Sequence, residues 1–208
     1  MSMLRDPSTK YSPFPQVPLT ERQWPTRTIT APPRWLSTDL RDGNQAIVDP
    51  MDAHKKTRFF DLLVEVGVKE IEVGFPSAGA TEFDFISGLV KSGRIPDDVM
   101  VQVLTQSRED LIRTSFASLS GARAAIVHLY NAVSPAWREV VFNMTRDQVR
   151  NIAVEGAKVM RDEAIDRVSL RRHGAALEGR DFGGDIVQCR LFLRRDAGAR
   201  QGGAGAQV

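Results

Sequence analysis

Residues 59–76 read FFDLLVEVGVKEIEVGFP and contain a complete passage from a helix to a strand. Apolar side chains recur at helical spacing through the first half, which predicts an amphipathic helix over residues 50–66. Gly67 is the residue type that most often ends a helix. Residues 70–73 then predict a short strand that stops before a Gly-Phe-Pro turn. A helix followed so closely by a strand is typical of a parallel α/β fold.

The same alternation continues on both sides of this segment. Further strands are expected at 35–39, 99–104 and 124–130, and further helices at 81–91, 108–119 and 145–163, with Thr145 as the N-cap of the last helix. This order predicts a parallel sheet with helices outside it. A doubly wound sheet and the first half of a (β/α)8 barrel both fit the order. No G-x-G-x-x-G follows the first strand and the sequence has no P-loop, which disfavours a nucleotide-binding version.

The composition is that of a globular protein. The 208 residues are 42% hydrophobic and 26% charged, and the net charge of +2 gives no argument for nucleic acid or a membrane as a partner. The single cysteine, Cys189, cannot form an internal disulfide. No apolar run approaches the roughly 20 residues that span a bilayer, and residues 1–25 lack the features of a signal peptide. A cytoplasmic location is therefore expected.

Residues 1–33 form a segment of their own. Seven prolines forbid a long helix or a central strand here. The segment also carries three aromatic side chains, Tyr11, Phe14 and Trp24, which a disordered tail seldom carries. We expect an extended arm that packs on the body of the protein or on a partner, and a flexible tail is the alternative.

The character of the sequence changes again after residue 165. Residues 166–208 contain eight arginines, no lysine and eight of the 16 glycines, and only residues 186–193 suggest a strand. This composition is typical of GC-rich coding DNA read in a shifted frame. The alternative is a basic tail that binds a polyanion. We expect this tail to be mostly disordered, because it has few apolar residues to bury.

The densest group of chemically useful side chains is STDLRDGNQ, residues 37–45, at the end of the first strand. The carboxyl ends of parallel strands face the ligand site in α/β folds. A carboxylate there can bind a hard divalent cation, and an arginine can clamp a carboxylate or polarise a carbonyl. A capped turn with surface charges is the alternative.

Three further groups lie near the ends of other strands. His128 and Tyr130 share one side of the fourth strand, because side chains alternate along a strand. Leu104 lies close to the end of the third strand, and alternation allows Glu72 on the second strand to point inward. The alternatives are a histidine satisfied by a backbone carbonyl and ordinary packing at strand ends. His54 is expected on the solvated face of its helix.

Four long strings of this sequence, in order, resemble 2-isopropylmalate synthases of the longer bacterial type. They are APPRWLSTDLRDGNQAIVDPMD (31–52), EVGVKEIEVGFPSAGATEFDF (65–85), VLTQSREDLIRTSF (103–116) and VHLYNAVSP (127–135). The arm string KYSPFPQVPLTERQWP (10–25) is similar to that type as well. The resemblance covers residues 5 to 164 and is specific, because the strings match at the right spacing.

The resemblance implies a TIM barrel, of which residues 34–165 would be the first half, with about four of the eight units. It implies a Claisen-type condensation of acetyl-CoA with 3-methyl-2-oxobutanoate in leucine biosynthesis, a homodimer, and a divalent metal ion (Mg²⁺, Mn²⁺ or Zn²⁺) that holds the oxo acid. Carried over by motif, Asp42 would be a metal ligand, and Arg41 would stabilise charge on the keto oxygen. The oxo-acid pocket would be lined by Leu104, His128 and Tyr130.

The sequence also departs from the family pattern. The family's other metal ligands are a His-x-His pair, which is absent from this sequence, and nothing after residue 165 matches the family's fifth strand with its substrate-binding glutamate. We therefore expect a truncated synthase that is inactive and poorly stable as written. Homocitrate and citramalate synthases share the Arg-Asp pair and stay open as relatives. A non-catalytic fragment that binds an intact synthase subunit is the second hypothesis, and a polyanion-binding protein is the third.

Overall fold

The computed structural model describes residues 6–10, 12, 15, 31, 33–167, 178–182 and 186–194. The chain divides into two units, residues 1–33 and residues 34–208. In the first unit the structure describes a short 3-10 helix, η1 (Pro7–Lys10), whose Thr9 hydroxyl donates to the carbonyl of Asp6 at 2.8 Å. The three aromatic side chains expected to anchor this arm lie outside the described residues.

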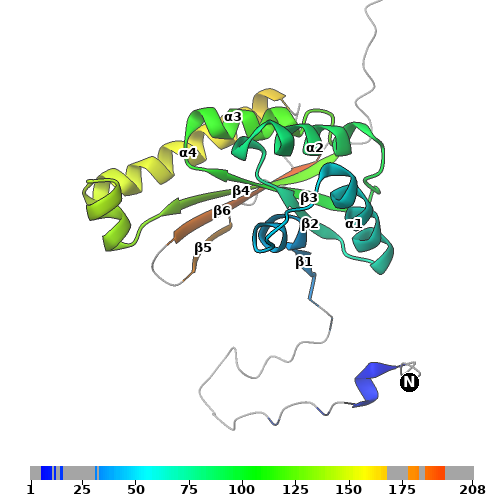
Figure 1. The fold of residues 1–208 in the computed structure, drawn as a ribbon. Helices are drawn as coiled ribbons and strands as arrows, with labels where there is room; N and C mark the ends of the chain where they lie inside the picture. Colours follow the sequence, from blue (N-terminus) through cyan, green and yellow to red (C-terminus); the bar gives the residue numbers. More distant parts are fainter. Residues whose placement is uncertain are drawn as a thin grey trace, which may run out of the picture. The chain divides into compact units, whose positions relative to one another are not determined.

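In the second unit, four parallel strands form a sheet in the order of the sequence. They are β1 (Leu36–Ser37), β2 (Glu70–Gly74), β3 (Met100–Gln106) and β4 (Ala124–Ala132) (Figure 1). Two antiparallel strands follow on the β4 side, first β6 (Ile186–Arg194) and then β5 (Glu178–Phe182). The parallel order confirms the expected α/β fold and is consistent with the first half of a TIM barrel, although the described strands do not close into one.

A helix follows each of the four parallel strands. These helices are α1 (Ala53–Val66), α2 (Ala80–Lys91), α3 (Glu109–Ser118) and α4 (Arg146–Arg167), with short turns η2 (Asp39–Gly43), η3 (Pro76–Ala78) and η4 (Trp137–Val141) between elements. The Asp52 carboxylate caps α1 by accepting from the Lys55 amide at 2.7 Å. Gly67 ends α1 in the left-handed conformation, with φ at 101°. The expected helix end at this glycine is thus confirmed.

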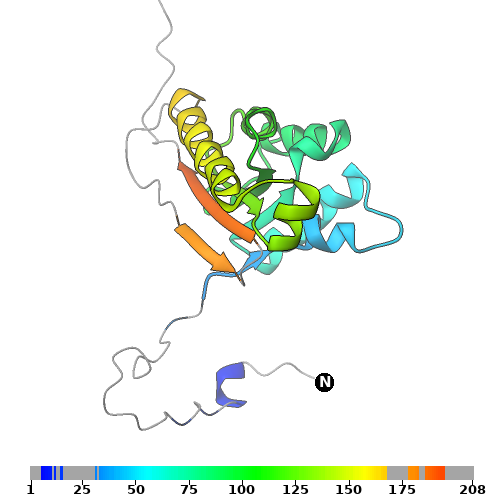
Figure 2. The same ribbon diagram turned by 90° about the vertical axis from the view of Figure 1, so that its left-hand side faces the viewer.

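The apolar core lies between the helices and one face of the sheet. Every second residue of the strands points into it, and the buried members include Ile71, Val73, Val101, Val103, Val127 and Leu129. Figure 2 shows α4 beside the strands from a second direction. The alternate residues point to the opposite face of the sheet, which we call the inner face. It carries Glu72, Gln102 and His128, and all three are buried.

The first strand is shorter than the sequence predicted. It ends at Ser37 instead of Asp39, because the chain turns into η2 at that point. The Ser37 hydroxyl donates to the Asp39 carboxylate at 2.6 Å, and the Thr38 carbonyl accepts from the Gly43 amide at 3.2 Å. These local bonds replace the ladder that a longer strand would have formed.

Part of the tail departs from the expected disorder. Residues 178–182 and 186–194 form β5 and β6, and β6 pairs with the whole length of β4. The edge of β4 would otherwise present unpaired backbone groups, and β6 satisfies them. Its side chains Leu191 and Leu193 are buried in the core. The strand expected at 186–193 is confirmed, whereas the pairing direction and β5 were not foreseen.

The start of α4 generates a stability prediction. The Thr145 amide donates to the Gln148 side-chain oxygen at 2.8 Å, and the Gln148 amide donates to the Thr145 hydroxyl at 3.3 Å, which together form a capping box. We expect Thr145→Ala to lower the free energy of unfolding by about 1 kcal/mol, measured by urea denaturation. Thr114→Ala is the matched control, because its hydroxyl only bonds the Asp110 carbonyl within α3. Equal losses in the two variants would contradict the cap.

Candidate active site

Four polar side chains from four different elements meet on the inner face. Arg41 comes from η2, Glu72 from β2, Gln102 from β3 and His128 from β4. The register of the parallel strands brings them together, since Glu72 pairs with Gln102 in the ladder. The same alternation that sends apolar residues to the core sends the three strand residues, Glu72, Gln102 and His128, to the other face. We call these four residues the inner-face network.

A buried ion pair lies at the centre of the inner-face network. The guanidinium of Arg41 donates from Nε to Glu72 Oε2 at 2.8 Å, and its Nη2 lies 2.6 Å from the same oxygen. The Glu72 side chain is fully buried, and that of Arg41 is 15% exposed. Arg41 Nη1 also contacts the carboxylate of Asp42, which is largely exposed. Arg41 therefore connects a buried acid to an acid at the surface, in a fixed orientation.

Gln102 connects the ion pair to His128. Its Nε2 donates to Glu72 Oε1 at 2.9 Å and lies 3.3 Å from His128 Nδ1. His128 Nδ1 is 3.6 Å from Glu72 Oε1, which is longer than a hydrogen bond. Two buried polar atoms of the network, Gln102 Oε1 and His128 Nε2, have no hydrogen-bond partner within the described part of the chain.

The network controls the charge of Glu72. Burial alone would raise the pKa of this carboxyl, because a low-dielectric interior disfavours the charged form. The hydrogen bond from Gln102 and the charge and hydrogen bond of Arg41 outweigh burial, so the pKa of Glu72 lies below its ordinary value. Glu72 is therefore a carboxylate at neutral pH and holds Arg41 by charge as well as by geometry.

The three residues expected to line a pocket come from neighbouring strands. Leu104 on β3 pairs directly with His128 on β4. Tyr130 lies two residues further along β4, where its hydroxyl accepts from Gln106 Nε2 at 2.7 Å. Its ring meets Phe75 edge-on, with ring centroids 6.5 Å apart. The structure thus brings Leu104, His128 and Tyr130 together on two adjacent strands.

Other polar residues of the 37–45 string have structural partners. Asn44 is buried, and its side-chain oxygen accepts from the Met51 amide at 2.7 Å, which closes the loop before α1. The Asp39 carboxylate accepts a hydrogen bond from the Ser37 hydroxyl.

His54 is exposed on α1, as expected. His173 lies outside the described residues, and only the backbone of Cys189 is described.

The described residues do not make a metal site. Within them, no group of three or more histidine, cysteine, aspartate or glutamate side chains is placed to hold a metal ion. Asp42, the expected ligand, has its carboxylate against Arg41. A catalytic metal needs about three protein ligands, so Asp42 could supply only a part of such a site.

Gln102 was not singled out by the sequence analysis. It stands in a strand of apolar residues, at the position that alternation assigns to the same face as Leu104. One signal could have revealed it. Alternation places this polar amide on the same face of the sheet as a glutamate and a histidine of the neighbouring strands.

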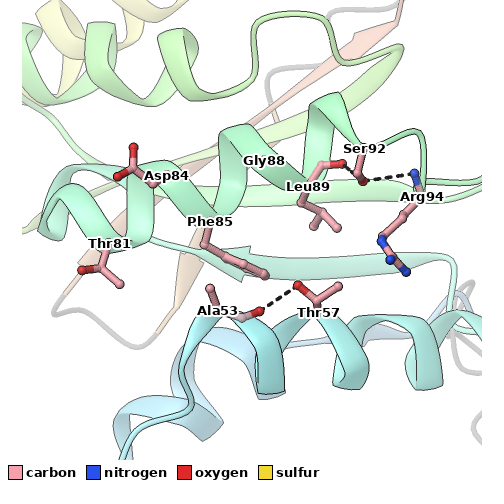
Figure 3. Close-up of a pocket in the computed structure, with 9 residues that line it drawn as sticks. All are labelled: Ala53, Thr57, Thr81, Asp84, Phe85, Gly88, Leu89, Ser92 and Arg94. Carbon is pink, nitrogen blue, oxygen red and sulfur yellow. Dashed lines mark hydrogen bonds between the residues drawn. The ribbon is translucent and has the colours of Figure 1, made fainter.

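A cavity of about 400 Å³ lies away from this network, between α1 and α2 (Figure 3). Its wall includes the apolar side chains of Phe85 and Leu89. The hydroxyls of Thr57 and Ser92 are satisfied by carbonyls of their own helices, each at 2.7 Å. None of the residues of the inner-face network lines it, so it is not a candidate for the chemistry of the expected site.

None of the helices in the described ranges is long and apolar enough to cross a membrane.

Comparisons with known proteins agree with the fold. The family model described as HMGL-like matches residues 32–183. A 2-isopropylmalate synthase of Pseudomonas fluorescens (strain Pf0-1) is 58% identical over 159 residues, which are 76% of this chain and 28% of that protein. The enzymes of the same name from Ralstonia nicotianae and Azotobacter vinelandii are each 56% identical, over 78% and 77% of this chain and 28% and 29% of those proteins. The chain therefore spans less than a third of the length of these relatives.

The buried ion pair generates a prediction about stability and its pH dependence. Glu72→Gln removes the buried charge that compensates Arg41, and we expect the free energy of unfolding to fall by roughly 3 kcal/mol at neutral pH. Folding lowers the pKa of Glu72. The Glu72 carboxylate therefore adds to the free energy of unfolding at pH values above its unfolded pKa, and this stabilisation is lost as the pH falls through its folded pKa. The difference between wild type and Glu72→Gln should be constant above about pH 5 and shrink below about pH 4.

Urea denaturation at several pH values measures this difference. Glu109→Gln is the matched control, because Glu109 forms an exposed pair with Arg113 on α3, and its loss should cost less than about 1 kcal/mol. A difference for Glu72→Gln that grows toward acid pH would contradict the assignment of Glu72 as a stabilising carboxylate.

Proposed function

The chain belongs to the HMGL-like family, and on that premise we propose that it carries the oxo-acid-binding half of a 2-isopropylmalate synthase active site. The reaction joins the acetyl group of acetyl-CoA to 3-methyl-2-oxobutanoate. Identity of 56–58% to synthases over three quarters of the chain supports this choice over other chemistries of the family. A homodimer and a cytoplasmic location belong to the same proposal.

The observation that carries the proposal is the orientation of Arg41. Two of its nitrogens are held by the buried carboxylate of Glu72, and its remaining terminal nitrogen lies beside Asp42. A guanidinium held in this way needs little reorganisation to stabilise negative charge that develops on a substrate oxygen. We assign that role to Arg41, for the keto oxygen of the oxo acid.

The side of the site that would hold the oxo acid is provided by β3 and β4. Leu104 offers an apolar surface for the branched chain of the substrate, and His128 and Tyr130 offer polar groups beside it. Their placement on adjacent strands supports a small, partly apolar ligand. Asp42 would contribute one ligand to the divalent metal of the family, and the described residues do not supply the others.

A chimera tests this proposal. Residues 5–164 of this chain would replace the matching segment of the Pseudomonas fluorescens synthase, and release of coenzyme A from acetyl-CoA in the presence of 3-methyl-2-oxobutanoate would be followed. We expect an active chimera, and a loss of roughly 10²-fold or more in kcat for the same chimera with Arg41→Gln. The 208-residue chain alone should give no turnover, because its sequence has no His-x-His pair.

Arg58→Gln in the chimera is the matched control, since Arg58 is an exposed arginine on α1. Its rate should equal that of the parent chimera. A folded but inactive chimera, or full activity with Arg41→Gln, would refute the proposal. Faster turnover with pyruvate or 2-oxoglutarate than with 3-methyl-2-oxobutanoate would instead assign the site to a citramalate or homocitrate synthase.

A further inference from the structure

The inner face contains two buried polar atoms without a partner in the described part of the chain, Gln102 Oε1 and His128 Nε2. Gln102 is 1% exposed and His128 is 9% exposed. Buried donors and acceptors are rarely left unpaired, and an exception calls for a physical reason. The reason here begins with the orientation of the Gln102 amide.

Glu72 determines which end of the Gln102 amide faces it. The carboxylate of Glu72 can only accept hydrogen bonds, and one of its oxygens lies 2.9 Å from the terminal amide group of Gln102. The amide nitrogen must therefore be the atom at that position, since an oxygen there would repel the carboxylate. This places the N–H donors of Gln102 between Glu72 and His128 and points its oxygen elsewhere.

The oriented amide in turn selects the tautomer of His128. The ring nitrogen Nδ1 lies 3.3 Å from the Gln102 nitrogen, which is a donor, so Nδ1 must act as the acceptor. A proton on Nδ1 would point at another N–H group, and its alternative acceptor, Glu72 Oε1, is 3.6 Å away. The neutral ring therefore carries its proton on Nε2, the atom that has no partner in the described chain.

We propose that Gln102 is a positioning residue that holds His128 as the Nε2–H tautomer, so that a buried, unpaired N–H donor is presented on the inner face to an oxygen of the ligand. The inference rests on the proposed function in taking that oxygen to belong to the oxo acid. A ligand oxygen would satisfy a donor that is otherwise left unpaired, which favours binding of a molecule with an acceptor at that place.

The tautomer can be measured without any ligand or turnover. Nitrogen NMR of the 208-residue chain labelled with ¹⁵N-histidine distinguishes the two ring tautomers, because the protonated and unprotonated nitrogens resonate far apart. His128→Gln assigns the signals, since the sequence has two other histidines, His54 and His173. We expect the wild-type ring of His128 to carry its proton on Nε2 at a pH where the ring is neutral.

Gln102→Met removes the amide while keeping a side chain of similar length. We expect His128 to lose the Nε2–H tautomer in this variant, with the proton moving to Nδ1 beside Glu72. Gln106→Met is the matched control on the same strand and face, because Gln106 bonds Tyr130 and not His128. It should leave the His128 tautomer unchanged. The dispersion of the amide spectrum shows whether each variant is folded.

Two results would overturn the proposal. One is a wild-type His128 with its proton on Nδ1, a measurement that needs no variant. The other is a folded Gln102→Met chain in which the Nε2–H tautomer persists. Addition of 3-methyl-2-oxobutanoate to the wild-type chain gives a separate reading. A shift of the Nε2–H signal supports the ligand contact, whereas an unchanged signal with the Nε2–H tautomer intact counts against the proposed function and leaves the role of Gln102 standing.

Discussion

The buried carboxylate of Glu72 is the group on which the rest of the inner face depends. It lies in the middle of β2 with no access to solvent. Arg41 compensates its charge, and Arg41 and Gln102 donate hydrogen bonds to its two oxygens. A buried charge is tolerated only when it is paired and hydrogen-bonded. Arg41 on one side and Gln102 on the other are therefore each held in one orientation. The orientation of the Gln102 amide in turn selects the ring tautomer of His128.

The two faces of the sheet have different roles. On one face, the apolar residues of β2, β3 and β4 pack against the helices and supply most of the buried surface. On the other face, the same strands carry three residues of the inner-face network, Glu72, Gln102 and His128. A one-residue shift in the register of any strand would exchange the two sets. The core therefore does more than stabilise the fold, because its register also places the site.

Much of the fold and of the site was predictable because local signals were strong. Helical periodicity, Gly67 and Thr145 predicted helix positions and ends, and the structure agrees with them to within a few residues. The string of residues 37–45 predicted a dense polar group at the end of the first strand. Gln102 was missed because the residues next to a single amide in an apolar strand do not indicate a role for it. Its role exists only beside Glu72 and His128, which are 30 and 26 residues away in the sequence.

The sequence by itself determined the parallel α/β order, the faces of the strands and the family of the chain, because these depend on local periodicity and on long matching strings. Only the tertiary structure decided two other features. The antiparallel pairing of β6 with β4 satisfies a sheet edge, and local sequence does not specify the direction of such pairing. The inner-face network depends on distances between strands, which the register of the sheet sets and which no single segment of the sequence contains.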